Sequence, residues 1–75
     1  MGWDKKVFAE RLKSLRKDQS VPLEMISKQI GSSISSISDW ENGKKLPLVD
    51  KLFKLAKFFN VSTDYLVGLK EYYEN

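Results

Sequence analysis

The side chains in this chain that could do chemistry are hydroxyls, ammonium groups and carboxylates, because its 75 residues include no His and no Cys. Without these two residues, a glycine-rich phosphate loop or a clustered set of carboxylates, no general acid–base site can be assembled. We therefore expect a protein that is not an enzyme and uses no cofactor and no metal. The net charge of +3 is compatible with an anionic partner, although a solvated lysine surface would carry the same charge.

Polar groups able to hold phosphate gather in the middle of the chain. Serines fill most of residues 32–36, and Lys44 and Lys45 directly follow Gly43. Hydroxyls, ammonium groups and the free N–H groups at a helix N-terminus all donate hydrogen bonds to phosphate oxygens. For the two lysines we favour phosphate contact over the alternative of a merely solvated turn.

A helix and a glycine turn are predicted just before the serines. Ile26 and Ile30 lie four positions apart, on one face of a helix that should span about residues 22–30. Gly31 can end this helix, since glycine adopts the left-handed conformation at little cost. The serine-rich segment should therefore begin at a sharp turn.

A second short helix should follow the turn, over residues 34–41. Ser33 offers a side-chain oxygen as its N-cap, and Gly43 follows its end. Ile37 and Trp40, three positions apart, should face inward. Two short helices joined by a glycine-containing turn are the components of a helix-turn-helix. The pattern predicts a protein that binds double-stranded DNA.

A first helix is expected to precede this pair. Asp4 is a suitable N-cap, and the helix should run to about residue 18. Trp3 before the cap and Phe8 inside the helix fit a hydrophobic staple. The first helix should therefore start at a well-defined residue.

Two more helices are predicted in the second half of the chain. The fourth should span residues 48–59 and end at Asn60, which tolerates the left-handed conformation. The fifth should span residues 63–67, with Ser62 as its N-cap. Strand alternation and linkers are absent from the sequence, so residues 1–75 should form one all-α domain of five helices. No apolar run approaches the ~18 residues that a membrane span needs, and we expect a cytoplasmic protein with no membrane partner.

With this order of elements, the chain resembles the Cro/repressor-type helix-turn-helix (XRE) family over about residues 8–68, leaving 69–75 as a tail. The matching landmarks are RLKSLR at 11–16, the Gly31 turn, SISDWENG at 36–43, Pro47, LAK at 55–57 and NVSTDYLVG at 60–68. The resemblance implies a compact five-helix domain that binds operator DNA as a homodimer. It also implies a prokaryotic regulator of transcription, a repressor of phage, mobile-element or small chromosomal type.

The resemblance further implies roles for individual residues. The helix over residues 34–41 would be the recognition helix in the major groove. Its base-facing residues would be Ser33, Ile34, Ser35 and Asp39. The phosphates would be contacted by Arg11, Ser36, Asn42, Lys44 and Lys45. An ion pair between Arg16 and Glu41 would tie the first helix to the third.

The chain departs from the family at several of these places. Leu23 stands where relatives have glutamine, Ser27 stands where they have alanine, and no base-facing residue is Arg, Gln or Asn. We therefore expect Ile34 to contact thymine methyl groups, unless it is half-buried filler, and we expect readout to depend largely on DNA shape. Asp39 could accept a hydrogen bond from cytosine or repel phosphate.

Apolar residues near the end of the chain offer a candidate dimer seam, made of Phe58, Leu66, Leu69 and Tyr72. The alternative is that Leu66 completes the core and the tyrosines cover it. A different function remains open for the same fold, that of an antitoxin or protein-binding module. No small-molecule ligand is expected.

Overall fold

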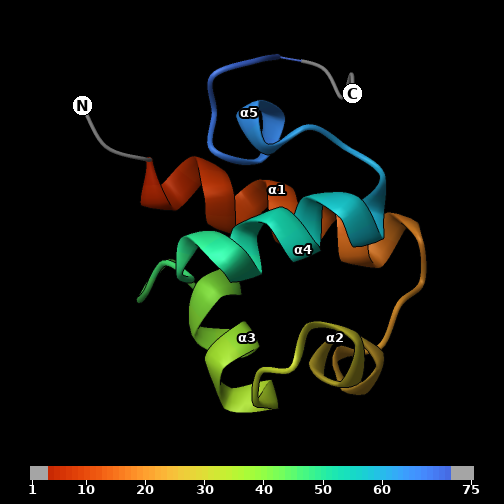
Figure 1. Ribbon diagram of the computed structural model, residues 1–75. Helices are drawn as coiled ribbons and strands as arrows, with labels where there is room; N and C mark the ends of the chain where they lie inside the picture. The colour runs from red at the N-terminus through yellow and green to blue at the C-terminus, as the bar shows by residue number, and fades with distance from the viewer. Residues whose placement is uncertain (1–3, 72–75) are drawn as a thin grey trace.

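The computed structural model describes residues 4–71, and this part of the chain is folded as five α-helices without a strand (Figure 1). The all-α prediction is confirmed. The helices are α1 (Lys5–Asp18), α2 (Leu23–Ile30), α3 (Ile34–Glu41), α4 (Val49–Phe59) and α5 (Thr63–Leu66). None of them is long and apolar enough to cross a bilayer within the described residues.

Five caps of the helices are those that the sequence indicates. Asp4 accepts hydrogen bonds from two backbone N–H groups of the first turn of α1, over 3.0 and 3.2 Å. Ser33 and Ser62 each accept one from the N–H three residues later. Gly31 and Asn60 end α2 and α4 in the left-handed conformation, with φ of 79° and 59°. The predicted hydrophobic staple between Trp3 and Phe8 depends on Trp3, which lies outside the described residues.

Helix boundaries differ from the prediction by one residue in three places. Pro22 and Leu48 are predicted inside α2 and α4, but their ψ angles of 153° and 159° are extended, so both residues are N-caps. Their carbonyl groups already accept the first helical hydrogen bonds. Val67 is the C-cap of α5 rather than its last residue.

One buried core holds the helices together, and all five helices contribute residues to it. Its buried residues are Phe8, Leu12, Leu15, Ile26, Ile30, Ile37, Trp40, Leu52, Leu55, Ala56, Phe59, Val61 and Leu66. In Figure 1, α4 crosses in front of α1, α5 lies above them, and α2 and α3 lie below. Because α3 packs against both α1 and α2, its orientation is set by the core.

Candidate nucleic-acid interface

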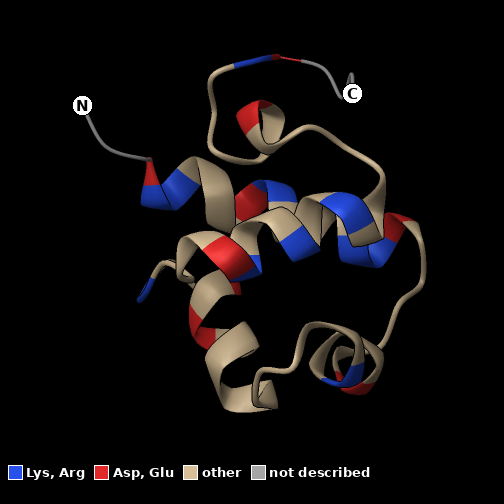
Figure 2. Ribbon diagram, viewed as in Figure 1, with Lys and Arg blue, Asp and Glu red and all other residues tan. Residues whose placement is uncertain are grey.

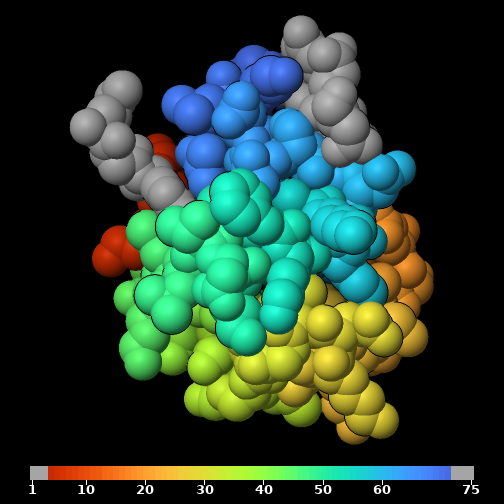
Figure 3. All heavy atoms as spheres, in the orientation of Figure 1, coloured from red at the N-terminus to blue at the C-terminus, as the bar shows by residue number. Residues whose placement is uncertain are grey.

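The inner side of α3 is buried and its first turn is open to solvent. Ile37 and Trp40 are in the core, as predicted, whereas Ser33 and Ser35 are exposed and Ile34 retains 43% of its accessible surface. In Figure 3 the first turn of α3 and the neighbouring α2 form the lower surface of the molecule. The N-terminal turn of α3 is therefore accessible from outside the molecule.

The outer part of α3 is also uncharged. Residues 32–38 contain only serine and isoleucine. In Figure 2 the acidic residues of α3 lie towards its other end, and the basic residues lie mainly on α1, α4 and the loop after α3. An anionic surface would therefore meet little repulsion at the first turn of α3.

The turn between α2 and α3 is held by two side chains. The Ser27 hydroxyl donates to the Ser32 carbonyl over 2.6 Å, so this serine, which stands where relatives have alanine, supports the turn. The Lys51 ammonium donates to the carbonyls of Ile30 and Gly31 over 3.1 and 3.2 Å. Sequence reasoning missed the role of Lys51, because it depends on a contact between residues that lie about twenty positions apart.

The serines at the start of α3 differ in their availability. The Ser33 oxygen accepts from the Ser36 N–H over 3.1 Å, and the Ser33 hydroxyl donates to the Ser36 hydroxyl over 3.0 Å. Ser33 is therefore occupied as a cap. Ser35 is exposed and carries no cap function. Ile34 and Ser35 are the two exposed side chains of this turn that do not cap the helix.

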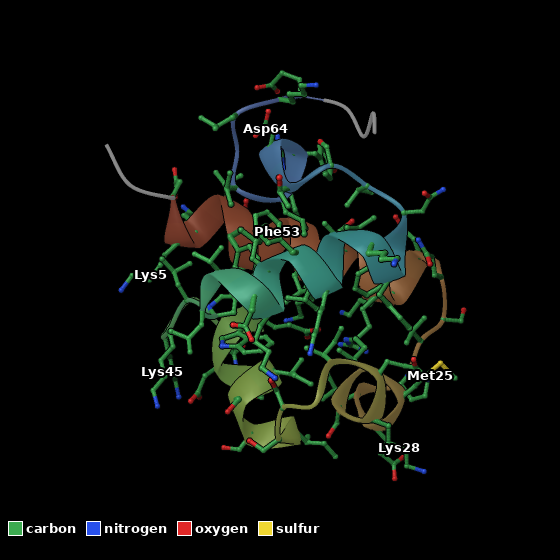
Figure 4. The ribbon with its side chains drawn as sticks, viewed as in Figure 1. Lys5, Met25, Lys28, Lys45, Phe53 and Asp64 are labelled. Carbon is green, nitrogen blue, oxygen red and sulfur yellow. The ribbon has the colours of Figure 1, made fainter. Side chains whose placement is uncertain are left out.

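Asp39 lies further along α3, beside the loop. Its carboxylate is 3.8 Å from the Lys45 ammonium, and the backbone N–H of Lys44 donates to the Asp39 carbonyl over 2.9 Å. Lys44 and Lys45 are both exposed, and Figure 4 shows Lys45 pointing away from the body of the protein. Because Lys45 partly neutralises Asp39, this carboxylate repels an approaching phosphate less than an unpaired carboxylate would.

Asn42 ends α3 with an exposed side chain. Its N–H donates to the Ser38 carbonyl over 3.0 Å, and its side-chain amide donates weakly to the Ser38 hydroxyl over 3.4 Å. Gly43 follows with a φ of 72°, which turns the chain so that the two lysines project beside α3. The predicted phosphate contacts Asn42, Lys44 and Lys45 are therefore brought together in one loop.

The far end of α3 is tied to α1 by a two-point ion pair. Arg16 donates to the two carboxylate oxygens of Glu41 over 2.5 and 3.0 Å, so the pair implied by the family resemblance is present. Only 5% of the Glu41 side chain is exposed. The hydrogen bond from Arg16 to Glu41 raises the pKa of Arg16, with a further Coulombic contribution, while burial opposes the shift. The pair fixes α3 from the side that faces away from solvent.

Arg11 does not join the other residues expected to contact phosphate. Its guanidinium lies over the Tyr65 ring, 4.2 Å from the centroid, and donates to the carbonyls of Tyr65 and Lys70. It also lies 3.9 Å from the Glu71 carboxylate. Arg11 therefore binds α1 to α5 and to the segment that follows it.

The candidate dimer seam is corrected at Leu66. This side chain is fully buried, so it completes the core and cannot contact a second chain. Phe58 is half-buried and packs edge-to-face on Phe59, with the ring centroids 4.9 Å apart. Leu69 is exposed. Tyr72 lies outside the described residues.

Sequence reasoning missed a set of exposed apolar residues at the start of α4. Leu48, Val49 and Phe53 keep 76%, 57% and 57% of their accessible surface. Figure 4 shows Phe53 on α4, on the side that faces α5. These residues lie off the buried stripe of α4. An apolar residue outside such a stripe is the signal that could have revealed them.

Comparison with known proteins decides the family. A family model described as helix-turn-helix matches residues 12–66, from α1 to the end of α5. The chain belongs to the helix-turn-helix family of the Cro/repressor (XRE) type. The matched residues of this helix-turn-helix protein include α2, α3, the turn between them and the Arg16–Glu41 ion pair.

Relatives of this helix-turn-helix protein include named regulators. It is 37% identical over 65 residues to the uncharacterized HTH-type transcriptional regulator YobD of Bacillus subtilis (strain 168), covering 87% of this chain and 58% of YobD. It is 36% identical over 64 residues to the HTH-type transcriptional activator BcrR of Enterococcus faecalis, covering 85% of this chain and 31% of BcrR. The chain thus spans only part of the length of each relative.

A similar solved structure is that of the P22 c2 repressor in complex with the synthetic operator 9T in the presence of Tl⁺. The two proteins are 30% identical and superpose with a TM-score of 0.80, over 85% of this chain and 97% of the repressor chain. The five-helix fold is therefore that of a repressor DNA-binding domain.

Proposed function

We propose that this protein regulates transcription by binding double-stranded operator DNA, with the first turn of α3 in the major groove. The observation that carries the proposal is the exposed, uncharged first turn of α3, held from behind by buried residues and flanked by Lys44 and Lys45. The helix-turn-helix relatives and the operator complex of the P22 c2 repressor support it. We assign a repressor role because the chain is similar to 97% of the P22 c2 repressor chain but to only 31% of the activator BcrR.

Base readout falls to few side chains in this proposal. Ile34 can contact thymine methyl groups, and Ser35 can donate to or accept from a base edge. Ser33 acts mainly as the cap. Asp39 would lie close to the phosphates of the DNA backbone. Since no arginine, glutamine or asparagine occupies these positions, we expect a preference for sites whose shape fits, with thymines opposite Ile34.

Phosphate binding falls to the α3–α4 loop and the N-terminus of α3. Lys44 and Lys45 are exposed and Asn42 stands beside them. The free N–H groups of the first turn of α3 add donors near Ser36. Arg11 is left out of this set, because its contacts with α5 and the following segment already use it.

We also propose that the protein acts as a two-fold homodimer. The seam in this proposal consists of the exposed residues Leu48, Val49 and Phe53 together with Leu69, and it leaves out the buried Leu66. A two-fold seam would set two α3 helices about 34 Å apart, one helical turn of DNA. Sedimentation of Phe53→Glu tests it: we expect dissociation into monomers and weaker binding to a two-half-site duplex. A dimer as stable as that of the unchanged chain would contradict this seam.

The DNA proposal is tested by selecting bound duplexes from a random pool and measuring anisotropy at several salt concentrations. We expect the logarithm of affinity to fall linearly with the logarithm of salt. Lys44→Gln plus Lys45→Gln should reduce the slope by about 0.9 for each phosphate that the protein no longer neutralises. Lys54→Gln plus Lys57→Gln, which removes the same charge from α4, is the matched control. Failure to select any duplex at low salt, or equal slopes in both variants, would contradict the proposal.

A further inference from the structure

We propose that a hollow between α2 and α4 docks a short acidic segment of a partner protein, with an apolar side chain at its centre. The hollow has a volume of about 310 Å³ and is lined by Gln29, Ile30, Lys54, Lys57 and Phe58. Its volume is at the lower end of the ~300–1,000 Å³ range of ligand clefts. This site is separate from the DNA surface proposed above.

The hollow combines an apolar wall with a basic rim. Ile30 is almost fully buried beneath it, and Phe58 is half-buried and held by its edge-to-face contact with Phe59. Phe58 also borders a second hollow towards the end of α1. Its ring is therefore an accessible apolar surface that the core keeps in place. An incoming leucine or phenylalanine would pack against it at little ordering cost.

The charge of the rim is uncompensated. Lys54 and Lys57 are exposed, and neither forms an ion pair with another residue of 4–71. No carboxylate lines the hollow. Lys51 differs from them, because its ammonium is already used by the carbonyls at the end of α2. Two free ammonium groups beside an apolar wall are complementary to carboxylates that flank an apolar side chain.

The position of the hollow favours a protein segment over nucleic acid. None of its lining residues belongs to α3 or to the loop that carries Lys44 and Lys45. In Figure 3 the hollow's two helices, α4 in cyan and α2 in yellow, meet on the face towards the viewer, to the side of the first turn of α3. A phosphate backbone would use the lysines and leave the half-buried Phe58 ring uncovered. The protein segment and DNA could therefore be bound together.

The experiment is an NMR titration of the ¹⁵N-labelled chain with the blocked hexapeptide Asp-Glu-Leu-Phe-Asp-Glu. We expect saturable shifts confined to the end of α2 and the second half of α4. Two control peptides separate charge from fit: one replaces the four acids by Asn and Gln, and the other replaces Leu-Phe by Ser-Ser. Each should bind at least tenfold more weakly than the parent peptide.

Two variants of the chain test the residues themselves. Lys54→Gln plus Lys57→Gln and, separately, Phe58→Ala should each weaken peptide binding at least tenfold while changing DNA affinity less than about threefold. Lys5→Gln plus Lys17→Gln removes the same charge from α1 and should bind the peptide as the unchanged chain does. An amide spectrum with native dispersion establishes that each variant is folded.

Several results would overturn the docking site. These are the absence of shifts at millimolar peptide, shifts centred on α3, and equal binding of the Ser-Ser peptide. A DNA duplex or RNA hairpin that perturbs the hollow more strongly than the peptide would assign it to nucleic acid. Loss of dimerisation on Phe58→Ala, with peptide binding intact, would assign the ring to a second copy of the chain.

Discussion

The two sides of α3 differ in what they contribute to the molecule. The inner side carries Ile37, Trp40 and Glu41, which are buried in the core or paired with Arg16. The outer side carries Ile34 and exposed serines, whose contacts within the protein are limited to caps. A small domain can thus hold a short helix rigidly and leave one face free. Changes on the inner side should cost stability, and changes on the outer side should cost DNA binding.

The largest effect is expected for Trp40→Ala on the inner side. Truncating a buried tryptophan removes apolar packing and leaves a cavity, so the free energy of unfolding should fall by about 3–5 kcal/mol. Urea denaturation followed by circular dichroism measures it. Ser35→Ala on the outer side is the control and should change stability by less than about 0.5 kcal/mol. A comparable decrease in the two variants would contradict the division between the two sides.

A smaller loss of stability is expected for Glu41→Gln. It leaves the Arg16 guanidinium without its counter-charge, which should cost about 1–3 kcal/mol. Because the pair raises the pKa of Arg16, the folded protein holds this proton more tightly than the unfolded chain. The stabilisation is therefore present below the ordinary pKa of arginine and is lost only above the raised one. The difference between the urea midpoints of the unchanged chain and the variant should be the same at neutral pH and at about pH 9.

A double variant sharpens that result. Replacing both partners, Arg16→Met plus Glu41→Leu, should recover part of the stability, because apolar residues can fill the site of a buried pair. If the single Glu41→Gln variant were as stable as the unchanged chain, the pair would not anchor α3.

On the outer side, Ile34→Ser should weaken binding to the selected duplex by about 1 kcal/mol, since it removes the apolar contact with a thymine methyl. Replacing that thymine by uracil should have the same effect on the unchanged chain and no further effect on the variant. Anisotropy titrations measure both. Independent, additive effects would show that Ile34 does not meet the methyl group.

The smallest effect is expected for Asp39→Asn. The substitution removes a negative charge that would lie beside the phosphates of the DNA backbone, and it releases Lys45. We therefore expect DNA affinity to rise by roughly two- to fivefold at low salt. In the Lys45→Gln background, Asp39→Asn should lose the part of the increase that comes from releasing Lys45 and keep the part that comes from removing the negative charge. A decrease of affinity in the single variant would instead mean that the carboxylate contacts a base.

The order of helices and their caps can be predicted because these signals are local. Asp4, Ser33 and Ser62 cap the N–H groups that the sequence places within their reach, and Gly31 and Asn60 adopt the left-handed conformation that glycine and asparagine tolerate. The predicted helix boundaries are therefore right to within one residue.

Contacts between distant residues cannot be predicted in the same way. Arg11 meets Tyr65 fifty-four positions later, and because of this contact we propose a phosphate set without Arg11. Leu66 and Phe53 have similar apolar side chains, and only the packing of α4 and α5 decides that one is buried and the other exposed. The ion pair of Arg16 is accessible from sequence through the family resemblance, since spacing alone does not determine it.

The most direct test of the account maps the DNA contact on the protein. The ¹⁵N-labelled chain should be titrated with its selected duplex at moderate salt. We predict that the largest amide shifts fall on residues 33–36 and 42–45, with the second half of α4 unaffected. Shifts centred on α4 or α5, with the first turn of α3 unchanged, would contradict the claim that the outer side of α3 enters the groove.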